Sequence, residues 1–126
     1  MFRLFSLFGK SAAMNALDDA LRAAGVHPLL VPEAVKLTVI RLLKREATAV
    51  PQDARFAEAA TLFAYCILGR DPFVEIHGVR AADRADARLE AAIAAGASLD
   101  ARLTLLALHA GLIAPDIADR IDVEDR

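Results

Sequence analysis

The sequence predicts an all-α fold, a single irregular bundle of five or six short helices. Three observations support this. Apolar residues recur at helical spacing along most of the chain, glycine and proline separate these stretches, and alanine, the strongest helix former, is abundant. The chain has 126 residues, about the length of one domain, and 56% of them are hydrophobic. We therefore expect residues 1–126 to form one helical domain with its own core.

The helix boundaries follow from glycine, proline and capping side chains. Gly25 is typical of the left-handed residue after a helix, Pro32 suits a first helical position, and Ser98 or Asp100 can cap an N-terminus. The expected helices are residues 2–24 with a break near 9–11, then 32–50, 53–68, 79–95, 98–111 and 115–121, followed by an acidic tail at 122–126.

Two stretches have a more specific expectation. In the third helix, apolar residues at helical spacing indicate a stripe that faces the core: Phe56, Ala59, Ala60, Phe63 and Ile67. Residues 71–78 have extended character, but a single short run has no partner strand with which to form a sheet. We therefore expect a loop there. The charged residues of 79–95 predict an exposed helix.

Charge and cysteine usage argue against several classes of protein. The net charge of −2 and a pI near 5.9 provide no general cationic field, so we do not expect nucleic-acid binding. We interpret two basic groups, Arg41, Lys44 and Arg45 and then Arg80, Arg84 and Arg88, as solvated faces. The single cysteine, Cys66, excludes an internal disulfide and is expected to be a small buried apolar residue.

Origin and location are inferred from composition alone. Arginine far outnumbers lysine and alanine is frequent, which is typical of a GC-rich bacterium. The N-terminus lacks a proper signal-peptide core, and no apolar run approaches the roughly 18 residues of a membrane span. We therefore expect a cytoplasmic protein.

Three polar residues deserve testing as a site. On an extended backbone, Glu75 and His77 would share one face, where a carboxylate can orient an imidazole for proton transfer. The interpretation we favour is a polar surface loop. His109 is surrounded in sequence by leucines, and we expect it to be hydrogen-bonded in or near the core rather than to bind a metal or ligand. We assign no catalytic, cofactor-binding or metal-binding residue.

Residues 1–10 form the most distinctive segment. If helical, Phe2, Leu4, Phe5, Leu7 and Phe8 surround a narrow polar stripe of Arg3, Ser6 and Lys10. So much apolar surface must be covered by the protein's own core, by a second subunit or by a membrane surface. Protein contact is the alternative we favour.

These observations favour a non-catalytic helical interaction or regulatory module that self-associates. One alternative is a peripheral membrane or membrane-partner adaptor that binds through residues 1–10. Another is an enzyme or small-ligand binder using Glu75, His77 or His109, although we lean against an enzyme. The helix at 99–110 is apolar on nearly every side, so we expect it to be either the central helix of the bundle or part of a self-association surface.

Overall fold

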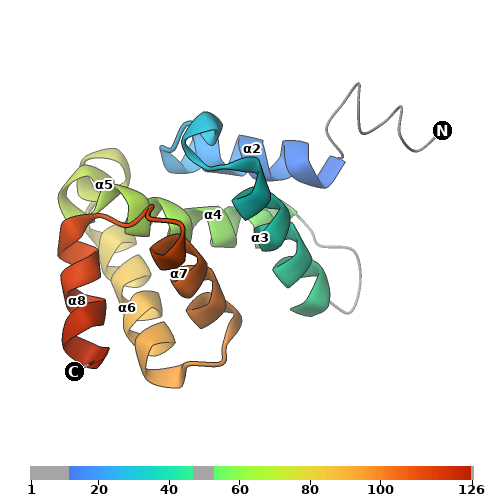
Figure 1. The fold of residues 1–126 in the computed structure, drawn as a ribbon. Helices are drawn as coiled ribbons and strands as arrows, with labels where there is room; N and C mark the ends of the chain where they lie inside the picture. The colour runs from blue at the N-terminus through green and yellow to red at the C-terminus, as the bar shows by residue number, and fades with distance from the viewer. Residues whose placement is uncertain (1–11, 47–52, 126) are drawn as a thin grey trace.

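The structure, a computed structural model, describes residues 12–46 and 53–125, and within these ranges it contains helices and no strand (Figure 1). The all-α prediction is confirmed. The described helices exceed the predicted five or six; they are α2 (Ala12–Ala24), the 3₁₀ turn η1 (Pro28–Leu30), α3 (Glu33–Glu46), α4 (Asp53–Leu68), α5 (Arg70–His77), α6 (Val79–Ala95), α7 (Leu99–His109) and α8 (Pro115–Asp125). The predicted segment 1–10 lies outside the described residues.

Helix α4 holds the centre of the fold and contacts α2, α3, α5, α6 and α7. Phe56, Ala60 and Phe63 of its predicted stripe are buried, which confirms that this helix faces the core. Its second half is buried on every side, since residues 62–66 are all nearly inaccessible. A helix that is apolar all round requires neighbours all round, and α4 has them.

The additional helix is α5, which occupies the segment predicted to be a loop. That prediction is wrong, because the helix depends on contacts and backbone conformations that the residues of this segment do not indicate by themselves. Gly69 and Gly78 bound the helix with φ of +84° and +93°, and Phe73 anchors it in the core. The backbone N–H of Arg70 donates to the Asp116 carboxylate at 3.1 Å, so α8 caps this helix from 46 residues away.

The predicted end of the helix at Gly25 and the predicted N-cap at Ser98 are confirmed. Gly25 has a φ of +101°, and the N–H of Val26 donates to the Leu21 carbonyl at 2.9 Å, which closes the end of α2. Ser98 accepts a hydrogen bond from the Ala101 N–H at 3.1 Å and caps α7. The last helix runs further than predicted, to Asp125, so residues 122–125 of the expected acidic tail are helical.

A buried ion pair joins α2 to α3. The Lys36 ammonium donates to the Asp18 carboxylate at 3.0 Å, and the two side chains are 6% and 5% exposed. Neither residue was predicted to be buried. Such a pair fixes the relative position of two helices, because separating the charges leaves one of them unpaired in the core.

Charged side chains also link α8 to α6. Arg120 donates to both Asp86 and Glu90, and the Tyr65 hydroxyl donates to Asp86 at 2.8 Å. The predicted exposed charges of α6 therefore include several that bind neighbouring helices. Ile117 of α8 is also buried.

No single helix within residues 12–46 and 53–125 is long and apolar enough to cross a membrane. Helices α6 and α7, bent by 93° at their connection, meet the length and composition criteria only as a pair.

Candidate functional site

The structure separates Glu75 from His77. They lie two positions apart on α5, a spacing that rotates the side-chain direction by about 200° around the helix axis. The two side chains therefore project to nearly opposite sides of the helix. The expectation that both would share a face is therefore wrong, since it assumed extended backbone. His77 Nε2 donates to the Ala24 carbonyl at 2.7 Å, and its ring packs on Phe73 with centroids 4.6 Å apart. Glu75 is exposed.

His109 is exposed at the end of α7, so the prediction that it lies in or near the core is wrong. Leu103 of the same helix is buried, whereas Leu105 shares the exposed side of the helix with His109. His27 is also exposed, and its Nδ1 accepts from the Leu29 N–H at 3.1 Å, which caps the η1 turn. Within the described ranges, no group of three or more His, Cys, Asp or Glu side chains is placed to hold a metal ion.

Cys66 is fully buried in α4, as predicted. Burial raises the pKa of its thiol from 9.0 to about 12, because a thiolate would lose its hydration there. A nucleophilic cysteine needs the opposite environment, one that favours the thiolate. The residue therefore serves the core.

Tyr65 is another buried group whose pKa is shifted. Burial raises the pKa of its phenol above 10.0, and the hydrogen bond to Asp86 raises it further. Its ring stacks edge-on against Phe73 with centroids 5.2 Å apart. Arg120 donates to the same Asp86 oxygen, Oδ1, so the arrangement joins α4, α6 and α8 and stabilises their packing.

Of the basic group Arg80, Arg84 and Arg88 on α6, Arg88 binds other helices of the same chain. Arg88 makes a two-pronged contact with Asp100 of α7, at 3.0 and 2.9 Å, and its third nitrogen donates to the Glu58 carbonyl at 2.9 Å. This geometry is the one that guanidinium and carboxylate groups prefer. Arg88 therefore connects α4, α6 and α7. Arg80 and Arg84 are exposed.

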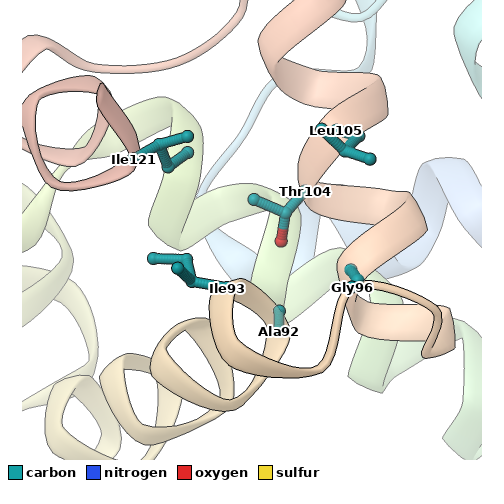
Figure 2. A pocket seen from close by; sticks show the side chains of 7 residues that line it. Ala92, Ile93, Gly96, Thr104, Leu105 and Ile121 are labelled. Atoms are coloured by element: carbon teal, nitrogen blue, oxygen red, sulfur yellow. The ribbon is translucent and has the colours of Figure 1, made fainter. Parts of the chain in front are cut away.

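An apolar groove lies between the end of α6, α7 and α8. Figure 2 shows side chains from these three helices around one space, which has a volume of about 190 Å³. The residues that line it are Ala92, Ile93, Gly96, Ala101, Thr104, Leu105 and Ile121. Thr104 contributes the one hydroxyl in this set, and it donates to the Asp100 carbonyl at 2.8 Å. The groove surface is therefore suited to apolar contact.

Helix α7 forms one wall of this groove and has two different sides. Leu103, Thr104 and Ala107 are buried against the bundle. Leu105 is 45% exposed and lies on the same line of the helix as Arg102 and His109, which are also exposed. Since α4 is the central helix, the expectation that α7 might be central is wrong. The alternative, a surface for self-association, fits the exposure of Leu105.

Comparisons with protein-family models, with curated proteins and with solved structures give no match to this chain. The groove must therefore be judged by its own residues. Sequence reasoning identified Leu105 because leucines occur all round α7. It missed Ile93 and Ile121 as walls, because they belong to other helices and only tertiary packing brings them beside Leu105.

Proposed function

We propose that this chain is a non-catalytic helical interaction module that self-associates through the groove between α6, α7 and α8. One observation carries the proposal: Leu105, 45% exposed, borders an apolar hollow of about 190 Å³ between three helices. When a partner covers such an apolar surface, the complex is stabilised by about 25 cal/mol for each Å² of apolar area buried.

The polar groups beside the groove support apolar contact. The Thr104 hydroxyl donates to a carbonyl of its own helix, and Arg120 of α8 already binds two carboxylates of α6. A partner surface can therefore cover the groove without leaving these groups unpaired, a cost of about 1–3 kcal/mol for each buried unsatisfied group. The walls are helical, so little backbone ordering accompanies binding.

A pair of matched variants tests the proposal. Leu105→Asp places a charge on the groove, while Leu37→Asp places the same charge on α3 at a residue that is 43% exposed and does not line the groove. In size-exclusion chromatography, we expect wild type and Leu37→Asp to elute earlier than a monomer, at an apparent mass larger than one chain. Leu105→Asp should elute as a monomer with the circular dichroism of a folded helical protein, because the residue is part-exposed.

The opposite result is equally clear. If Leu105→Asp is folded and elutes with the wild type, the groove does not mediate self-association. If wild type, Leu105→Asp and Leu37→Asp all elute as monomers, the chain does not self-associate and the proposal is wrong.

A further inference from the structure

We infer that α5 and α8 form one conformational unit that opens while the rest of the bundle stays folded, with the docking of α8 keeping α5 helical. This device belongs to the single chain and stands apart from the proposed self-association. Three features support it: the weak local support of α5, the attachment of α8, and the hydrogen bond that joins the two helices. In Figure 1, α8 lies at the edge of the bundle beside α6, and α5 lies near the end at which α8 begins.

Helix α5 has little support from its own residues. It has eight residues, whereas isolated helices shorter than about 12–15 residues are marginal in water. Val74 and Ile76 are β-branched and favour extended backbone. Gly69 provides no side chain to cap the N-terminus, and Phe73 is the buried residue of the helix. The helical state of α5 therefore depends on contacts from other parts of the chain.

One of these contacts comes from α8. The Asp116 carboxylate accepts a hydrogen bond from the Arg70 N–H at 3.1 Å, and its negative charge suits the positive end of the helix dipole. The fit at this point is close, because a Cβ added to Gly69 would lie 2.6 Å from an Asp116 oxygen. At the other end of α5, His77 donates to the Ala24 carbonyl at 2.7 Å. If α8 moves away, α5 loses the cap at its N-terminus.

Helix α8 is itself attached by few side chains. In the part of the chain that the structure describes, its backbone approaches the bundle less closely than that of any other helix. The buried ones among its described side chains are Ile117 and Ile121, and Ile121 borders the hollow of about 190 Å³, so part of its surface lacks packing partners. Arg120 binds Asp86 and Glu90, which are 32% and 61% exposed. Elements attached in this way open at a low cost in free energy.

The other helices are joined by contacts that such an opening leaves in place. The buried ion pair between Asp18 and Lys36 joins α2 to α3, and Arg88 connects α4, α6 and α7. Neither interaction involves α5 or α8. The bundle can therefore remain folded when these two helices open.

Amide hydrogen exchange in the full-length protein, resolved to individual helices, tests the inference. In wild type, the slowest amides of α5 and α8 should share one opening constant, at least about tenfold larger than that of α4. Arg120→Ala should raise the exchange rates of both helices about tenfold, although Arg120 binds carboxylates of α6. Arg84→Ala, at an exposed residue of α6, should change neither rate. If Arg120→Ala does not fold, Glu90→Ala removes one of the two carboxylates at an exposed position and should raise both rates by a smaller factor.

Two further variants examine the cap itself. Asp116→Ala deletes the carboxylate that accepts from Arg70 and should raise the exchange rates of α5 about fivefold. Asp119→Ala removes an exposed carboxylate of the same helix and should leave α5 unchanged. Equal behaviour of α5 in these two variants would show that Asp116 does not link the helices, and the inference would be wrong.

A core variant distinguishes this opening from unfolding of the whole bundle. Ile40 of α3 is buried, and Ile40→Val should raise the exchange rates of the slowest α4 amides about fivefold while leaving α5 and α8 unchanged. A rise in α5 and α8 in step with α4 would overturn the inference, because the two helices would then open only when the whole bundle unfolds. Faster exchange in α8 alone after Arg120→Ala would also overturn it, because α5 would then open independently of α8.

Discussion

Replacing Asp18 by alanine should be among the most destabilising single changes in this protein. The Asp18 carboxylate accepts a hydrogen bond from the Lys36 ammonium at 3.0 Å, and both side chains are almost completely buried between α2 and α3. Without Asp18, the ammonium remains in the core beside Leu17, Leu21 and other apolar side chains. It must then either lose its proton or pull the helices apart to reach water.

The expected magnitude follows from the burial of the pair. Removing one partner of a buried ion pair costs about 3–5 kcal/mol, because the other charge is left uncompensated. A domain of this size has a total stability of about 5–15 kcal/mol. The midpoint of thermal unfolding should therefore fall by roughly 10–20 °C. Replacing both partners, Asp18→Leu with Lys36→Met, should recover most of the loss, because neither charge of the pair is then left in the core.

The neighbouring residue supplies a matched control. Asp19 pairs with Arg22 at 3.7 Å, but these side chains are 78% and 60% exposed. Asp19→Ala should cost less than about 1 kcal/mol, since exposed ion pairs contribute little. Urea unfolding followed by circular dichroism measures all three variants. Equal losses for Asp18→Ala and Asp19→Ala, or a double variant no better than Asp18→Ala, would refute the reasoning.

Three further predictions concern the core and its joints. At pH 8, alkylation of Cys66 should be at least about 1,000-fold slower in the native protein than in urea, because raising the thiol pKa from 9.0 to about 12 depletes the reactive thiolate. The native protein should begin to react only as the pH rises toward 12. Comparable alkylation rates at pH 8 in the two states would show that the thiol is accessible. Gly69→Ala should destabilise more than Gly96→Ala. Both glycines have positive φ, but a Cβ at Gly69 would lie 2.6 Å from an Asp116 oxygen and 3.2 Å from the Ala114 Cβ, whereas a Cβ at Gly96 would meet no atom within 4 Å. Calorimetry compares the two variants, and equal losses would contradict the packing argument. Arg120→Ala should lower the free energy of unfolding in urea by about 1–3 kcal/mol, because Asp86 and Glu90 lose their arginine partner. Arg84→Ala, at an exposed residue, should lower it by less than about 0.5 kcal/mol. Similar values for the two variants would mean that the Arg120 contacts do not stabilise the packing of α8.

Much of the fold was predictable because its signals are local. Gly25 ends α2 and Ser98 caps α7 through contacts within a few residues, and the stripe of α4 repeats at the helical period. Helix α5 was not predictable in the same way. Its N-terminus is capped by Asp116, which is 46 residues away from Arg70, so no pattern within residues 69–78 records that contact.

The candidate site divides along the same line. The excess of leucine on α7 singled out Leu105, because one neighbouring helix cannot cover both sides of an apolar helix. The same leucines gave the wrong environment for His109, since the sequence does not say which side of α7 faces the bundle. Likewise, the pairing of Lys36 with Asp18 depends on how α2 and α3 cross, which is a property of tertiary packing.

The most direct test of the central claim is the mass of the wild-type protein in solution. Sedimentation equilibrium across a range of concentrations should show a mass that rises from one chain, 13.5 kDa, toward two or more chains, while Leu105→Asp stays at the mass of one chain throughout. A wild-type mass that remains at 13.5 kDa over the whole range would contradict the account, because the groove would then face solvent and bind no second copy.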